Sequence, residues 1–154
     1  MSTSPSTTGR SQSLIRTAAM LVGAVFVLVG ILGFVPGITT NSGDLEFMGH
    51  DSGAKLLGLF QVSILHNVVH LLFGIAGIAA SRASASASRS YLIGGGAVYI
   101  VLWIYGLLVD KTSEANFVPL NNADDWLHLL LGVAMIGLGL ALAKTVTSDG
   151  SRVR

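Results

Sequence analysis

The 154-residue sequence contains no cysteine, which excludes disulfide bonds, thiolate metal ligands and cysteine nucleophiles together. Charged residues are also scarce: they make up 11% of the chain, whereas soluble domains carry about 25%. The formal net charge is only +1, so nothing indicates a nucleic-acid partner. What the chain does contain is 51% hydrophobic residues at a mean hydropathy of +0.70. This composition predicts that its main partner is the lipid bilayer.

The apolar residues fall into four long runs, and about 20 such residues are enough for a helix to cross the bilayer core. The first run exceeds the roughly 7–15 apolar residues of a signal peptide, so we expect it to be a retained span. The predicted fold is an all-α membrane protein whose four transmembrane helices form a four-helix bundle. We expect a disordered tail at 1–13, a membrane domain at 14–145 with spans at 14–35, 54–80, 91–109 and 125–143, and a second tail at 146–154.

Basic residues are distributed unevenly between the two sides of the predicted spans. Seven of the nine Lys and Arg residues lie in the terminal segments or in the central Ser-rich connection at 81–90. The other two, Lys55 and Lys111, lie in or beside the remaining loops, which hold most of the acidic residues. Because cytoplasmic loops carry an excess of Lys and Arg, we expect both termini in the cytoplasm and two acidic loops outside.

Two stretches of the sequence occur twice. HLLFGIAGI at 70–78 recurs as HLLLGVAMI at 128–136, and GAVF at 23–26 recurs as GAVY at 96–99. The same alignment brings Gly33 into register with Gly106. The chain is therefore predicted to be a tandem repeat of a two-helix unit, with both units entering the membrane in the same sense.

Polar motifs stand at matched places in the two units. The second run contains His66-Asn67-x-x-His70, and the fourth begins with Asp124-Asp125-x-x-His128. Residues four apart lie on one face of a helix, and ionisable groups within a membrane usually face the protein interior. We therefore expect the two motifs to point inward and meet as one polar cluster. Either Asn122 or Asp124 is expected to cap the fourth span.

These motifs also carry a family resemblance. The segments LLGLFQVSILHNVVHLLFG and PLNNADDWLHLLLG, with the span between them, resemble the bacterial family catalogued as domain of unknown function 4383. The resemblance covers roughly residues 16 to 144. It implies a multi-span protein of a bacterial inner (plasma) membrane, and it implies no reaction.

Three interpretations of the polar cluster remain open. The cluster can be structural, since polar side chains bond across membrane helices at about 0.6 kcal/mol each. It can bind a small ligand, a divalent metal or haem, with His66, His70, Asp124 and His128 as the candidate metal ligands. It can also serve proton or cation transport, which in so small a scaffold would require a homo-oligomer.

Nothing in the sequence resembles a phosphate-binding loop, a dinucleotide-binding fingerprint or a nucleophile elbow. We therefore do not expect an enzyme. The predicted function is that of a multi-pass membrane protein whose buried cluster packs the helices or binds a small ligand. No cofactor is required by the sequence.

Overall fold

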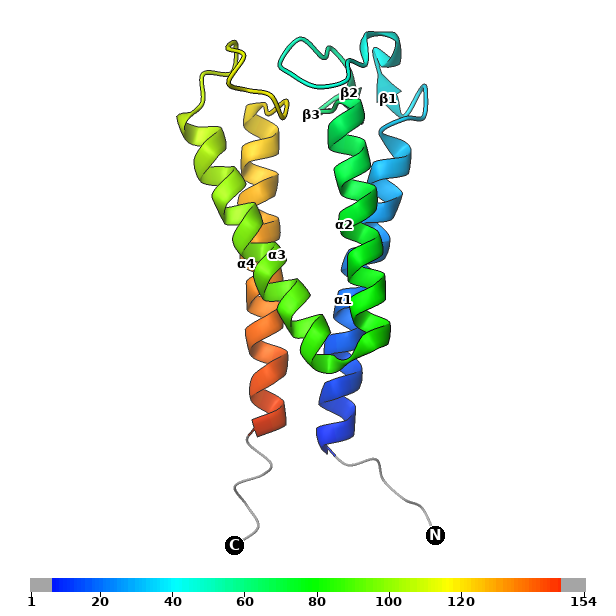
Figure 1. Ribbon diagram of the computed structural model, residues 1–154, viewed down its shortest axis with the longest axis vertical. Helices are drawn as coiled ribbons and strands as arrows, with labels where there is room; N and C mark the ends of the chain where they lie inside the picture. Colours follow the sequence, from blue (N-terminus) through cyan, green and yellow to red (C-terminus); the bar gives the residue numbers. More distant parts are fainter. Residues whose placement is uncertain (1–6, 148–154) are drawn as a thin grey trace, which may run out of the picture.

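The computed structural model describes residues 7–147, and four long helices dominate it (Figure 1). Each is long and apolar enough to cross a membrane. The start of the first helix and the end of the last lie at one end of the molecule, and the two long loops lie at the other (Figure 1). The helices are α1 (Thr7–Leu32), α2 (Ile64–Ala83), α3 (Ala85–Leu108) and α4 (Asn122–Thr147).

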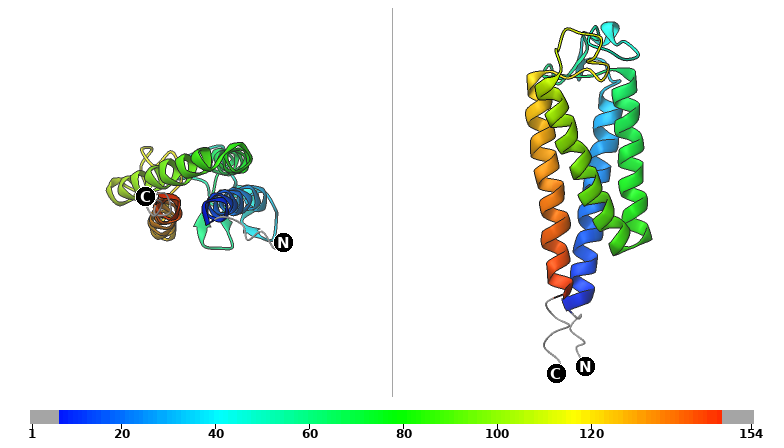
Figure 2. Two further views of the ribbon diagram at one scale, coloured as in Figure 1. Left: turned by 90° about the horizontal axis from the view of Figure 1, so that it is seen from below. Right: turned by 60° about the vertical axis from the view of Figure 1, so that its left-hand side comes forward.

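The helices pack mainly as two pairs. The most extensive contacts are those of α1 with α2 and of α3 with α4. Seen from below, α3 crosses from the end of α2 toward α4 and so connects the pairs (Figure 2). Since α3 follows α2 almost without a break, the connection between the two pairs is very short.

The first loop contains a small antiparallel sheet that the all-α prediction did not include. Its strands are β1 (Thr39–Thr40), β2 (Lys55–Leu56) and β3 (Phe60–Gln61), in the order β1-β2-β3, with a 3-10 turn η1 (Ser42–Asp44) between β1 and β2. Leu57 and Gly58, at positive φ angles of 55° and 70°, make the turn between β2 and β3. Ala54, Leu56 and Val62 are buried beneath this sheet and pack against the end of α1.

The helix α2 begins later than the apolar run expected at 54–80, because the first part of that run forms β2 and β3. Ser63 fixes the start of the helix. Its backbone is extended, and its side chain accepts a hydrogen bond from the backbone N–H of His66 at 3.1 Å. A serine in this position satisfies a backbone donor that the helix itself cannot pair.

The helix α3 begins at Ala85, ahead of the expected span at 91–109. Most of the Ser-rich segment expected as a loop is therefore helical. Only Ser84 is extended, at φ −165° and ψ 167°, and it caps α3 by accepting the backbone N–H of Ala87 at 3.0 Å. Within the helix, Ser88 donates to the carbonyl oxygen of Ser84 at 2.8 Å. Such local bonds let serine fit a helix that its propensity alone does not favour.

The predicted tails lie only partly within the described residues. Residues 7–13 are the first turns of α1, so this part of the expected N-terminal tail is helical. The helix α4 likewise continues to Thr147, beyond the expected span end at 143. Residues 1–6 and 148–154, which hold the rest of both predicted tails, lie outside the described residues.

Within each helix pair, the two helices approach each other closely at matched glycines. A Cβ atom added at Gly23 of α1 would lie 2.7 Å from the carbonyl oxygen of Gly74 on α2. A Cβ atom added at Gly96 of α3 would lie 2.8 Å from the carbonyl oxygen of Gly132 on α4. The sequence repeat aligns Gly23 with Gly96 and Gly74 with Gly132, so aligned residues make equivalent contacts. Small residues of this kind allow membrane helices to pack backbone to backbone.

Candidate functional site

Three of the histidines singled out by the sequence line one partly open cavity of about 200 Å³. His66 and His70 reach it from α2, and His128 reaches it from α4. Tyr99 of α3 adds a phenol, and the remaining wall is apolar. The other lining residues are Leu65, Val69, Leu102, Phe117 and Val118. The last two belong to the loop between α3 and α4, so the cavity lies toward the loop end of the molecule.

His66 and His70 lie one helical turn apart, and their rings stack with centroids 4.3 Å apart and an angle of 18° between their planes. The Nδ1 atom of His70 is 3.0 Å from the carbonyl oxygen of His66. Because a carbonyl oxygen can only accept, His70 carries its proton on Nδ1 when neutral. Its Nε2 atom is then left as an acceptor.

Aligned residues of the two units form equivalent ring contacts beside the cavity. Phe26 stacks on His70 at 5.5 Å, and Tyr99 contacts His128 at 5.3 Å. Phe26 and Tyr99, which the repeat aligns with each other, stack across the interface at 5.4 Å. The rings therefore join the two helix pairs through one aromatic cluster next to the histidines.

Two of the cavity histidines carry buried nitrogen atoms without a partner. The Nδ1 atoms of His66 and His128 make no hydrogen bond within the described part of the chain. The two residues are only 8% and 4% exposed. Buried polar groups are almost always hydrogen-bonded to protein or to a bound molecule. These two nitrogens therefore lack the hydrogen-bond partner that a buried polar group normally has.

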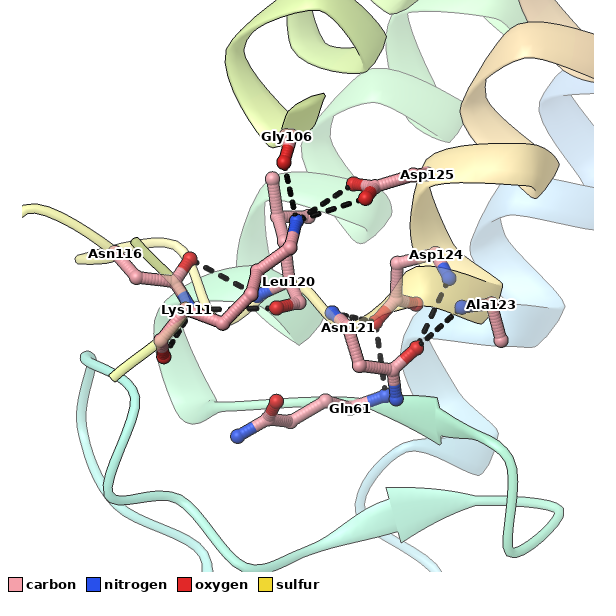
Figure 3. A network of polar contacts seen from close by, with 9 residues as sticks. All are labelled: Gln61, Gly106, Lys111, Asn116, Leu120, Asn121, Ala123, Asp124 and Asp125. Carbon is pink, nitrogen blue, oxygen red and sulfur yellow. Dashed lines mark hydrogen bonds and ion pairs between the residues drawn. The ribbon is translucent and has the colours of Figure 1, made fainter. Parts of the chain in front are cut away.

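Asp124 has a different role from the histidines, because it fixes the start of α4 to the first loop. Its Oδ2 atom accepts the backbone N–H groups of Asn121 at 2.9 Å and of Gln61 on β3 at 3.1 Å (Figure 3). Asn121 returns the contact, since its Oδ1 atom accepts the N–H groups of Ala123 and Asp124. This is a reciprocal helix cap. Of the two expected capping residues, Asp124 takes part in it, but its partner at the start of the helix is Asn121 and not Asn122.

Replacing Asn121 with alanine is expected to lower the free energy of unfolding by about 1–2 kcal/mol, since the helix loses its cap. The variant also loses the bond from Asn121 Nδ2 to the carbonyl oxygen of Leu59, at 2.8 Å. The matched control is Asn122→Ala, at an exposed position with no side-chain hydrogen bond among those found in the described region. Unfolding in mixed detergent micelles measures both. Equal effects of the two variants would contradict the assignment of the cap.

Among the residues that the structure describes, Asp125 is the member of the predicted cluster that forms an ion pair. Its carboxylate lies 2.8 and 3.0 Å from Lys111 Nζ, which also donates to the carbonyl oxygen of Gly106 at 2.6 Å (Figure 3). The Asp125 side chain is 6% exposed. A Cβ atom added at Gly106 would overlap Asp125 Oδ1, so only glycine allows this approach. Lys111 was not predicted as a member of the cluster.

Asn67 occupies the equivalent place in the first unit. It is 1% exposed, and a Cβ atom added at Gly33 would overlap its side-chain amide. The repeat aligns Asn67 with Asp125 and Gly33 with Gly106. In the first unit, the neutral amide of Asn67 packs against glycine. In the second unit, a carboxylate packs against glycine and is paired with a lysine.

Three of the four predicted metal ligands line the cavity together, and the fourth, Asp124, does not. Asp124 bonds to backbone N–H groups and does not line the cavity. Within residues 7–147, the group of candidate ligands whose atoms all lie within 4.8 Å of one another is a different one, formed by His50, Asp51 and Glu114. The cavity is also smaller than the roughly 300–1,000 Å³ typical of cofactor pockets, which disfavours haem. The geometry thus suits a small organic molecule better than a metal or haem.

The comparisons with known proteins identify a family but no activity. No curated protein and no solved structure matched the chain. One family model, described as a domain of unknown function, matches residues 16–141 and so covers both histidine motifs and all or nearly all of each span. The chain is therefore a member of the family Domain of unknown function (DUF4383).

Proposed function

We propose that this protein is a multi-pass protein of the bacterial cell membrane that binds a small, mostly apolar molecule between its two helix pairs. The observation that carries the proposal is the pair of unpartnered Nδ1 atoms of His66 and His128, both buried and both in residues that line one cavity. The proposed site residues are His66, His70, His128 and Tyr99. Asn67, Asp124 and Asp125 hold the helices in place around it.

The walls of the cavity define the class of ligand. A cavity of about 200 Å³ has the volume of roughly seven molecules of liquid water. An apolar protein cavity of about 150 Å³ can hold benzene. Imidazole and phenol groups both donate and accept hydrogen bonds. The fitting ligand is therefore a single ring or a short chain with one or two hydroxyl or carbonyl groups.

The proposed topology places this cavity toward the outside of the cell. Most Lys and Arg residues of the described part of the chain belong to the start of α1, the junction of α2 with α3 and the end of α4, opposite the two long loops (Figure 1). The charge rule assigns that end to the cytoplasm. Phe117 and Val118, at the opposite end, belong to a loop that is then extracytoplasmic. The ligand would reach the cavity from outside or from the outer leaflet. We further propose that the two helix pairs arose by duplication, which the equivalent glycine and ring contacts support.

Phenol is the probe for this proposal, because it combines one ring with one hydroxyl group. We expect phenol to bind in lipid nanodiscs with a dissociation constant on the order of 1 mM, given the usual affinity per atom of small ligands. The chain has four histidines, and three of them line the cavity. Saturable NMR shifts of the ring signals of His66, His70 and His128 are expected, while those of the loop residue His50 stay unchanged.

Toluene and the variant His128→Leu provide the controls. Loss of one hydrogen bond costs about 0.5–1.5 kcal/mol, so His128→Leu should weaken phenol binding by roughly 2–10-fold and leave toluene binding nearly unchanged. Shifts that do not saturate, or that affect His50 as strongly as the other three, would contradict the proposed site.

A further inference from the structure

A second group of ligating side chains lies outside the four long helices, where the two long loops meet. His50 and Asp51 come from the loop between α1 and α2, and Glu114 comes from the loop between α3 and α4. One ligating atom of each lies within 4.8 Å of those of the other two. The loops also share a backbone hydrogen bond here, from Gly49 N–H to the carbonyl oxygen of Phe117 at 2.8 Å. Residues more than sixty positions apart are thus held side by side.

The charges around His50 are predominantly negative. Its Nε2 atom lies 3.3 Å from Asp51 Oδ1, and Glu114 approaches from the facing loop. Like charges this close repel each other unless a cation lies between them.

We propose that His50, Asp51 and Glu114 bind a divalent cation of the zinc type between the two extracytoplasmic loops. One imidazole and two carboxylates are donors that zinc accepts, and three protein ligands leave a fourth position for water. The mixed nitrogen and oxygen set favours zinc over calcium or magnesium, which prefer oxygen ligands alone. This site is separate from the cavity, and the proposal does not depend on the proposed ligand.

The site would also control the wall of the cavity. Phe117 follows Glu114 closely in the chain and lines the cavity. A cation that joins Glu114 to His50 would therefore hold the loop between α3 and α4 over the cavity. The hydrogen bond from Gly49 N–H to the Phe117 carbonyl oxygen joins the two loops in this same arrangement. Zinc is thus expected to slow deuterium exchange at the amide of Gly49.

Zinc titration of the full-length protein in nanodiscs tests the proposal by calorimetry. We expect saturable binding of one Zn²⁺ per chain. His50→Ala and Glu114→Gln should each weaken it by about tenfold or more, since each removes one of three ligands. The control Glu46→Gln removes an exposed carboxylate of the same loop that is not part of the group. The control His128→Leu removes a cavity imidazole. Both should change the affinity by less than about twofold.

Three results would overturn the proposal. They are the absence of saturable zinc binding to the unmodified protein, an affinity that neither His50→Ala nor Glu114→Gln reduces, and a larger loss in His128→Leu than in His50→Ala. Glu114 is exposed and the His50 side chain is 19% exposed, so gel filtration and unfolding measurements check that both variants are folded. Slower exchange at Gly49 on zinc addition, lost in Glu114→Gln, would support it independently of affinity.

Discussion

Lys111→Met is expected to lower the free energy of unfolding by about 3–5 kcal/mol, because it leaves the buried carboxylate of Asp125 without its cation. Asp125 has a 6% exposed side chain, and both of its oxygens lie within 3.0 Å of Lys111 Nζ. The Lys111 side chain is 28% exposed, so water can partly solvate the carboxylate once the lysine is removed. The loss of stability is therefore expected to be about 3 kcal/mol, the lower end of this range. Unfolding in mixed detergent micelles, followed by circular dichroism, measures it.

The double variant Lys111→Met/Asp125→Asn is expected to recover most of that loss. An amide carries no charge, so it needs no counter-ion when buried. The first helix pair already shows this arrangement, with Asn67 packed against Gly33 and no lysine beside it. Recovery to within about 1–2 kcal/mol of the unmodified protein is expected, because hydrogen bonds to Lys111 are still lost. Strictly additive effects of the two substitutions would contradict the pairing.

Gly106→Ala is expected to lower the free energy of unfolding by about 2–4 kcal/mol. The added methyl group would overlap Asp125 Oδ1, so α3 and α4 must separate or the carboxylate must leave Lys111. Overpacking costs about 1–3 kcal/mol on its own, and displacement of the ion pair adds to it. The same unfolding measurement applies.

Gly94→Ala is the matched control for this substitution. Gly94 lies in the same helix, and an added Cβ atom there would meet nothing within 4 Å. Since alanine favours helix by up to about 1 kcal/mol over glycine, Gly94→Ala should leave stability unchanged or raise it slightly. Equal stability of the two alanine variants would contradict the close contact between Asp125 and Gly106.

The sequence was most informative about features that periodicity and composition determine by themselves. The apolar runs located four membrane-spanning helices, and the repeat paired Gly23 with Gly96 and Phe26 with Tyr99 before any contact was known. It was less informative where single hydrogen bonds decide the backbone. Ser63 and Ser84 set the starts of α2 and α3, because each side chain replaces a missing helix bond. A Ser-rich or apolar run does not reveal which of its residues will do this.

Partners that come from a loop could not be predicted from spacing. Lys111 lies 14 residues before Asp125 and reaches it only because the loop folds back over the end of α3. Asp124 looked like a metal ligand from its place in the motif. It instead joins α4 to β3, a strand that the apolar run did not indicate. Its contacts therefore depend on the tertiary arrangement of the two loops.

The two aligned units differ in a way that separates structure from the proposed binding. The repeat aligns His66 with Asp124, yet His66 lines the cavity and Asp124 fixes a loop. The aligned pair His70 and His128 keeps its place in both units and faces the cavity from both. We infer that this pair is the shared part of the site, and that His66 is specific to the first unit.

Cysteine cross-linking tests most directly whether the two histidine motifs meet inside the protein. The chain has no cysteine, so His70→Cys/His128→Cys introduces a unique thiol pair. A short bifunctional thiol reagent applied in native membranes is predicted to join the two positions within one chain, as read by mass spectrometry. The pair Leu72→Cys/Leu130→Cys, at outward-facing positions on the same helices, should not be joined. Failure to join positions 70 and 128 in the folded protein, or equal joining of positions 72 and 130, would contradict a cavity shared by the two motifs.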